Sequence, residues 1–470
     1  MELGRILPGV LLGALLAGQD PLMVPVKRKP SDREWKEHPT WTLAHARGYV
    51  PRREPPEVDA YGGDPARKAE PRGFFYAKRS GARWWLVDPE GHLFLHVAVC
   101  SVSPGRGSAR AAEAFDRKFG GEERWAAETA AFLWAHGFNG TGAWSKDALL
   151  RGAPRRLAYT PIWNFMSSYG KRRGGTFQKP GHTGYPKDAI FVFDPEFETF
   201  AMEHARPLAA LKDDPWLLGH FSDNEMPLYR RTLDNFLSLP EGDPGHRAAR
   251  AWLEARKGKG ADPRAVDAAD REAFLGFVVD RYASVVAKAI RAHDPNHLYL
   301  GCRFHSDEKN IPAAFEAAGR HMDVVSVNLY GAWTPDEGRL ADWVRWSGKP
   351  FLISEFYAKG EDSGMKNTTG AGWLVKTQRE RGLFYQNFVL GLLESGGCVG
   401  WHHFKYQDND PEDPKTDPSN RDSNKGIVSA YYEEYPEFLG PMRELNWNVY
   451  GLAAWLERGG RVHPRGEAGR

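Results

Sequence analysis

Two glutamates stand at the ends of apolar runs, where their carboxyl groups are placed to take part in chemistry. Glu225 follows Asn224 and ends the run that begins at Trp216. Glu355 ends a second run, which begins at Phe351. A buried strand that ends on a polar residue is how a barrel enzyme holds a carboxylic acid at its mouth. Two such carboxyl groups on facing strands predict general acid–base and nucleophilic work on one substrate.

Two facing carboxyl groups suit the hydrolysis of a glycosidic bond. When they lie about 5–5.5 Å apart, one attacks the anomeric carbon while the other protonates the leaving oxygen and later activates water. Asn224 can hydrogen-bond a sugar 2-hydroxyl, Tyr330 can donate to the nucleophile, and Trp401 can form an apolar floor under the ring. A lone strand-end glutamate is more often a surface or salt-bridged residue, so the prediction depends on the pair.

The elements that must position these residues alternate between short apolar strands and longer helical stretches. Amphipathic stretches at 111–135, 271–293 and 382–394 come before the second, fifth and eighth strands. Strand and helix alternating eight times indicate an α/β fold, a (β/α)8 TIM barrel with its catalytic groups at the C-terminal ends of the strands. On this count Glu225 ends the fourth strand and Glu355 the seventh. The strands are expected within 92–99, 136–142, 157–163, 216–221, 298–304, 324–330, 351–355 and 398–404.

The first residues resemble a secretory signal peptide, because Arg5 precedes an apolar run and small residues follow it; a short membrane anchor is the alternative. The next stretch is rich in Pro, Gly and charge, and we expect an extended leader on the surface, partly disordered. A β-hairpin over 83–99 then opens the barrel. We therefore expect the protein to be secreted or periplasmic. The expected boundaries are 1–18 for the signal, 19–73 for the leader, 74–456 for the barrel and 457–470 for a C-terminal tail.

Composition argues against several classes of protein. Lys and Arg number 63 against 61 Asp and Glu, so nothing in the charge balance indicates a nucleic-acid partner. No later segment has the run of about 20 apolar residues that a membrane helix needs. The three cysteines, Cys100, Cys302 and Cys398, are expected to be buried free thiols. None has a Cys or His partner at ligand spacing, so we expect no metal and no organic cofactor.

Two long loops, 226–270 and 407–425, are expected to wall a cleft on the active face. The acidic run 408–417 in the second loop does not match a calcium-binding EF-hand, and a solvated lid is the better interpretation. The basic run 170–175 either is a solvated loop or meets a sulfated or carboxylated glycan.

Several stretches of the chain resemble one group of enzymes. Asn224-Glu225 after the fourth strand and Glu355 after the seventh are similar to the clan A retaining glycoside hydrolases. The segment 214–225 resembles the corresponding segment of β-agarases, notably those of glycoside hydrolase family 50. Further similar stretches are 84–91, 137–139, 300–304 and 400–406, and the resemblance covers roughly 74–456.

The resemblance implies roles for individual residues. Glu225 is expected to be the acid/base and Glu355 the nucleophile. Arg303 and His305, after the fifth strand, either bind sugar hydroxyls or support the top of the barrel. The full predicted set of substrate-binding residues is Asn139, Trp144, Asn224, Arg303, His305, Asn328, Tyr330, Tyr357, Trp401 and His403.

The implied activity is the cleavage of a galactose-containing polysaccharide or oligosaccharide by double displacement. A β-galactosidase or a β-glucanase of the same clan is the alternative within this class of enzyme. The alternative from another class is a glycan-binding barrel that does not turn over, although both required carboxyl groups are present.

Overall fold

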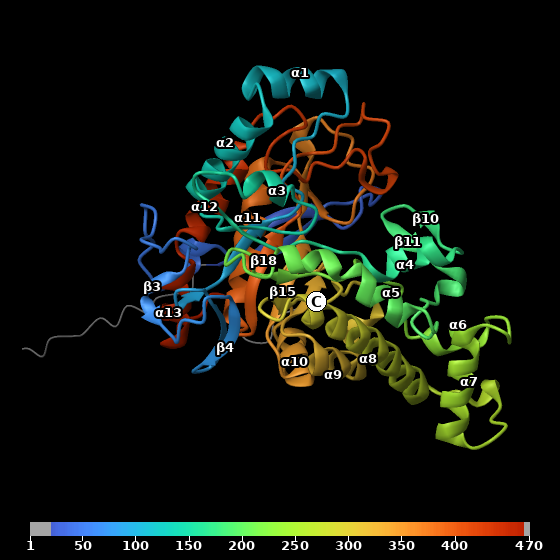
Figure 1. Cartoon of the computed structure of the whole chain (residues 1–470). Coiled ribbons are helices and arrows are strands. Elements are labelled where there is room, and N and C mark those ends of the chain that lie inside the picture. Colours follow the sequence, from blue (N-terminus) through green and yellow to red (C-terminus); the bar gives the residue numbers. More distant parts are fainter. Residues whose placement is uncertain (1–19, 465–470) are drawn as a thin grey trace, which may run out of the picture.

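The structure is a computed structural model that describes residues 20–464, so the predicted signal peptide at 1–18 lies outside the described residues. Helices surround a central group of strands, and α8, α9 and α10 lie next to one another on one side of that group (Figure 1). Within the described part of the chain, no helix is both long enough and apolar enough to cross a membrane.

Eight parallel strands form the centre. Six of them make one sheet in the order β14-β15-β18-β7-β8-β9, and β12 pairs with β13. Parallel bridges from Tyr159 to Leu217 and from Phe304 to Val327 join the two groups, so the pairings follow the chain in a cycle. The strands are β7 (His96–Val99), β8 (Gly140–Thr141), β9 (Ala158–Tyr159), β12 (Gly219–His220), β13 (Leu298–Tyr299), β14 (Val325–Asn328), β15 (Phe351–Phe356) and β18 (Cys398–His403).

The alternation of parallel strands with helices confirms the predicted α/β fold, and each predicted strand range contains one of these strands. The predicted helical stretch 111–135 is two helices, because Gly120 at φ 67° leaves the helical region and breaks it. The helices are α1 (Ala109–Lys118), α2 (Glu122–Ala135), α3 (Asp147–Leu150), α4 (Phe165–Arg173), α5 (Phe197–His204), α6 (Thr232–Leu237), α7 (Pro244–Lys257), α8 (Ala268–His293), α9 (Pro312–His321), α10 (Glu337–Ser347), α11 (Gln378–Glu394), α12 (Pro436–Asn446) and α13 (Val449–Glu457).

The two longest helices have N-termini that the sequence encodes directly. Asp267 before α8 and Thr377 before α11 each accept a hydrogen bond from the backbone of the third helical residue. Asp270 and Glu380 reach back in turn, which completes a capping box at both helices. Both helices have long buried faces: α8 packs on α5, α6 and α9, and α11 packs on α12, β16 and β18. The three cysteines are buried free thiols as expected.

Residues 22–68, expected to form an extended leader, contribute three strands. Val24 and Val26 of β1 are buried, and β1 pairs antiparallel with β17. The predicted hairpin is present as part of a four-stranded sheet in the order β3-β6-β5-β4. The outer strands are β1 (Leu22–Lys27), β2 (Lys36–Thr40), β3 (Asp64–Lys68), β4 (Tyr76–Ser80), β5 (Arg83–Val87), β6 (His92–Phe94), β10 (Phe177–Lys179), β11 (His182–Gly184), β16 (Ala358–Gly360) and β17 (Trp373–Val375).

Candidate active site

A cavity of about 460 Å³ lies where the central strands reach their C-terminal ends, and both glutamates line it. Glu225 follows β12 after a short turn, and Glu355 lies within β15. Five of the predicted substrate-binding residues line the same cavity: Trp144, Asn224, His305, Tyr330 and Tyr357. The fold therefore brings together two carboxyl groups that lie far apart in the sequence.

Glu355 is almost fully buried and receives a hydrogen bond on each carboxylate oxygen. The Tyr330 hydroxyl donates to Oε2 at 2.6 Å, and the Arg303 guanidinium donates to Oε1. Burial raises the pKa of Glu355, and the Arg303 charge is the largest influence in the opposite direction. Arg303 is itself fully buried and cannot lose its charge, so it favours the ionised form of this carboxyl.

Glu225 has a different set of neighbours. The Asn328 amide donates to Oε1 at 2.8 Å, and the Nδ1 atoms of His182 and His305 lie 3.0 and 3.2 Å from its two oxygens. Burial alone would raise the pKa of Glu225, but the His182 contact and the nearby His305 outweigh it and lower that pKa to about 2. The same contact raises the pKa of His182, while burial lowers that of His305. Of the two rings, His182 is therefore the one whose protonated form the contact with Glu225 favours.

A network of hydrogen bonds among Arg303, Asn224 and Asn328 joins the two carboxyl groups. Arg303 Nε donates to the Asn224 side-chain oxygen at 3.0 Å, and the same oxygen accepts from Asn328 at 3.2 Å. Asn328 is the register partner of Glu355 between β14 and β15, and its own oxygen accepts from Ser354 at 2.6 Å. Arg303 thus bonds Glu355 and the Asn224 side chain beside Glu225, and Asn328 bonds Glu225 and Asn224. These contacts fix the orientation of both carboxyl groups.

Four residues of the site adopt a left-handed backbone conformation, which is unfavourable for residues other than glycine. The φ angles are 48° for Glu225, 52° for Ser101, 58° for Arg303 and 63° for Trp144. The Trp144 ring lies over the Arg303 guanidinium, 4.4 Å from ring centre to carbon. Strained backbone of this kind concentrates at functional sites, where the surrounding structure holds it.

Of the five predicted binding residues that do not line the cavity, Arg303 and Asn328 belong to the network of hydrogen bonds that joins the two glutamates, and the other three lie elsewhere. Asn139 precedes β8, and its side chain bonds Val97 N and Leu95 O at the opposite end of the strands. The Trp401 indole is fully buried and donates to the Tyr385 hydroxyl of α11. The His403 ring packs against Phe438 of α12 and contacts the Lys425 carbonyl. Trp401 and His403 share the outer face of β18, so both point toward the helices.

The cavity also contains residues that the sequence analysis missed. His182 begins β11, and Phe404, Lys405 and Lys425 follow β18 or belong to the loop after it. The loop 407–425 supplies further lining residues and so does wall the cavity as expected. No pattern of hydrophobicity marks these positions, because the path of a loop depends on tertiary contacts.

The basic run 170–175 does not reach the cavity. It forms the end of α4, where Arg172 pairs with Glu203 at 2.9 Å and Arg173 pairs with Asp194 at 2.6 Å. Both arginines are therefore paired with carboxylates of the protein on the outer surface. A glycan-binding role for this run is therefore not supported.

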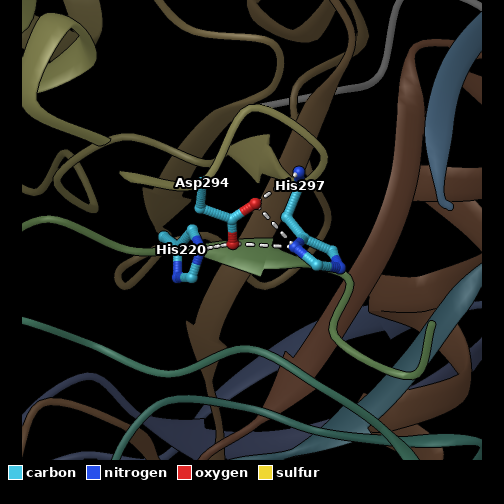
Figure 2. Close-up of side chains that lie close together, drawn as sticks. All are labelled: His220, Asp294 and His297. Atoms are coloured by element: carbon cyan, nitrogen blue, oxygen red, sulfur yellow. Dashed lines mark hydrogen bonds and ion pairs between the residues drawn. The ribbon is translucent and has the colours of Figure 1, made fainter. Parts of the chain in front are cut away.

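Two groups of histidine and carboxylate side chains in the described residues are close enough together to hold a metal ion. One, at the β5–β6 turn, consists of Asp59, Glu90 and His92; the other consists of His220, Asp294 and His297. Figure 2 shows the Asp294 carboxylate of the second group between two imidazole rings, with Nε2 of His220 and Nδ1 of His297 both at 2.7 Å.

The remaining ring nitrogens of the second group also have protein partners. Nδ1 of His220 accepts from the Trp163 indole at 3.0 Å, and Nε2 of His297 contacts the Asp214 carbonyl at 3.0 Å. All three side chains are buried. The group therefore acts as a hydrogen-bonded link between β12, which leads to Glu225, and the end of α8.

Replacing Asp294 by alanine should destabilise the protein, because it leaves two buried imidazole rings and two backbone N–H groups without their acceptor. We expect the free energy of unfolding to fall by about 3 kcal/mol, measured by chemical denaturation. Asp213→Ala, a loss of an exposed carboxylate nearby, should have little effect. A fall in melting temperature on adding a chelator to the wild type would contradict this structural role.

The chain is similar in sequence to two agarases, although no model of a protein family matches it. Beta-agarase B of Vibrio sp. (strain JT0107) is 24% identical over 486 residues, which cover 82% of this chain and 49% of the agarase. Beta-agarase A of the same strain is 25% identical over 491 residues, covering 83% and 48%. The crystal structure of BpGH50 is 30% identical with a TM-score of 0.82, over 93% of this chain and 96% of that one. The chain belongs to glycoside hydrolase family 50.

The structure of an exo-beta-agarase shares the fold of this family 50 chain, with a TM-score of 0.70 and 22% identity over 87% of this chain and 69% of that one. The chain spans about half the length of the two Vibrio agarases. Its similarity to BpGH50, in contrast, extends over nearly the whole of both chains.

Proposed function

We propose that this protein is a retaining glycoside hydrolase of clan A that cleaves β-linkages in agar-type, galactose-containing polysaccharides or oligosaccharides. The observation that carries the proposal is the pair of buried glutamates on one cavity, joined through Arg303, Asn224 and Asn328. The similarity to two agarases supports the class of substrate. No metal or organic cofactor takes part in the proposed reaction.

Glu355 is the proposed nucleophile. Its two oxygens accept hydrogen bonds from a permanently charged guanidinium and from a phenol, and neither donor needs to exchange a proton with it. These donors hold the carboxylate ionised and fixed for attack on the anomeric carbon. Departure of the leaving sugar then produces a glycosyl-enzyme ester, which water hydrolyses in the second step.

Glu225 is the proposed acid/base. Its contacts include two imidazole rings, which can give up or take up protons at neutral pH. With His182 in contact, Glu225 is ionised and the proton is held on the ring. The proposed acid step needs that proton on Glu225. Binding of the substrate must therefore place the leaving oxygen between His182 and Glu225 and separate the ring from the carboxyl group. In the second step, the ionised Glu225 accepts a proton from the attacking water and is protonated again.

The catalytic strands are proposed to form a (β/α)8 TIM barrel. Support comes from the cycle of parallel pairings, in which each neighbour along the chain is also a neighbour in space. Glu225 and Glu355 then end the fourth and seventh strands, where such barrels carry their catalytic groups. Export remains a proposal as well, and it rests on the composition of residues 1–18.

Product analysis by mass spectrometry tests the proposed function. Purified protein would be incubated with agarose, porphyran, carrageenan, β-galactan and β-glucan oligosaccharides, beside the Glu355→Ala variant. Cleavage of an agar-type substrate by the wild type alone would support the proposal. Cleavage of β-glucan alone would mean that the enzyme is a β-glucanase and acts on no agar-type galactan. Binding without any cleavage would favour a non-catalytic glycan-binding protein.

The His182→Gln variant should alter the pH dependence of activity. The wild-type pair loses its last proton from His182, whose pKa the Glu225 contact raises, whereas the variant must hold that proton on the Glu225 carboxyl itself. We expect the alkaline limb of the kcat/KM profile to move to lower pH, because this profile reports groups in the free enzyme. His246→Gln, on α7, is the matched control. An alkaline limb that stays in place or moves to higher pH would contradict the role of His182.

A further inference from the structure

Two lysines in the cavity have no carboxylate partner. Lys405 and Lys425 both line the cavity that contains the catalytic glutamates. Among residues 20–464, no carboxylate oxygen lies within the 4.0 Å ion-pair distance of either ammonium group, whereas Arg303 in the same site is paired with Glu355. The catalytic network therefore accounts for Arg303 but leaves these two cations unexplained.

The ammonium groups are held in place by neutral amides. Lys405 Nζ donates to the Asn409 side-chain oxygen at 2.6 Å, and Lys425 Nζ donates to that of Asn420. Asn409 in turn donates to Asn420, so the four side chains form one continuous row along the cavity wall. The Phe404 ring lies 4.8 Å from Lys425 Nζ. An ammonium has three donor hydrogens, and each lysine uses one of them in this row.

Burial makes this arrangement costly without an anion. Lys425 is only 1% exposed, and Lys405 is half-buried. Burial lowers the pKa of Lys405 to about 8 and that of Lys425 well below its ordinary value. A buried ammonium that is bonded only to amides pays for desolvation without the attraction of an opposite charge.

Three carboxylates favour the charged form of Lys425, in the order Glu355, Asp408 and Asp417, but each is bonded elsewhere. Glu355 accepts from Arg303 and Tyr330. Asp408 accepts from the backbone N–H groups of Lys425 and Gly426 and from the Asn424 amide. Asp417 lines the cavity, but its oxygens accept from Ser419 N at 2.9 Å and from the Asn420 amide at 3.3 Å. None of the three forms an ion pair with either ammonium group.

We propose that Lys405 and Lys425 bind an anionic substituent of the sugar in the active site, either a sulfate ester or a carboxylate. This inference rests on the proposed function, because it names the kind of galactan that the same cavity accepts. Both substituents present several oxygen acceptors, which the free donor hydrogens of the two lysines can reach together. The anion replaces water around the ammonium groups with an opposite charge and so offsets their desolvation.

Binding to the Glu355→Gln variant tests the proposal without turnover. Calorimetric titration would compare a neutral agar-type oligosaccharide with the same oligosaccharide carrying one sulfate, and then with one carrying a carboxylate. We expect an anionic form to bind at least about tenfold more tightly than the neutral form. The sulfate and carboxylate arms distinguish the two sources of charge.

The double variant Glu355→Gln/Lys405→Met should reduce this ratio to about one, and Lys405→Arg should restore most of it because the charge is kept. Lys415→Met is the matched control, since Lys415 is an exposed lysine of the same loop and should leave the ratio unchanged. Melting temperatures would verify that each variant is folded.

The possible outcomes separate the two proposals. Equal binding of neutral and anionic sugars, or a preference that survives Lys405→Met, would overturn the inference while leaving agar-type binding intact. Binding of none of the sugars by folded Glu355→Gln protein would overturn the inference together with the proposed function. Tighter binding of the anionic form that depends on Lys405 supports both.

Discussion

Glu355→Gln should lose on the order of 10⁴-fold or more in kcat on agar-type oligosaccharides. The amide keeps the shape of the side chain, and its oxygen can still accept from Arg303 while its NH2 group takes the place of the oxygen that accepts from Tyr330, but it cannot attack an anomeric carbon. The loss should appear in kcat because the bond to Glu355 forms only during the reaction. Steady-state kinetics by reducing-sugar release would measure it.

The nucleophilic role has a direct chemical signature. Adding azide to Glu355→Ala should restore turnover and produce a glycosyl azide of inverted configuration, because azide enters from the side that the carboxylate occupied. Glu361→Gln, an exposed glutamate a few residues further along the chain, is the matched control and should keep full activity. Normal turnover by folded Glu355→Gln protein would rule out the assignment.

Glu225→Gln should lower kcat by roughly 10²–10⁴-fold on natural linkages. The variant keeps the side-chain length and the contact with Asn328 but cannot protonate a leaving sugar oxygen. On an aryl glycoside whose phenol leaves without protonation, the first step should recover, and the glycosyl-enzyme should accumulate because the base for the second step is missing. Burst kinetics would show this accumulation.

The comparison between leaving groups separates acid catalysis from general damage to the site. Glu241→Gln, an exposed glutamate in the long loop after β12, should leave both substrates unaffected. An equal loss on natural and aryl substrates would mean that Glu225 supports the structure of the site and does not supply the proton.

The central strands, and the meeting of Glu225 and Glu355 at one cavity, could be predicted from the sequence because buried parallel strands are short apolar runs that end abruptly. The same reasoning failed for Trp401 and His403. A strand directs alternate side chains to opposite faces, and the sequence shows that these two share a face without showing which one. The structure answers this: His402, between them, contacts His96 and Phe221, while Trp401 and His403 contact the helices.

His182 and the lysine pair could not be predicted in the same way. Their positions depend on how a hairpin and a long loop fold back over the strand ends, and neither segment has a regular apolar period. The strand β1 was missed for a related reason. Only Val24 and Val26 of its residues are buried, although it pairs with a strand on each side, so its apolar pattern is too short to distinguish it from an extended segment.

The position of β1 links the beginning of the folded chain to the wall of the cavity. This strand pairs with β17, which pairs with β16 directly after the segment that contains Glu355. Arg28, one residue past β1, donates to the carbonyl of Ala371, which lines the cavity. A recombinant version that starts after residue 40 would therefore lack two strands of the sheet that follows the segment with Glu355.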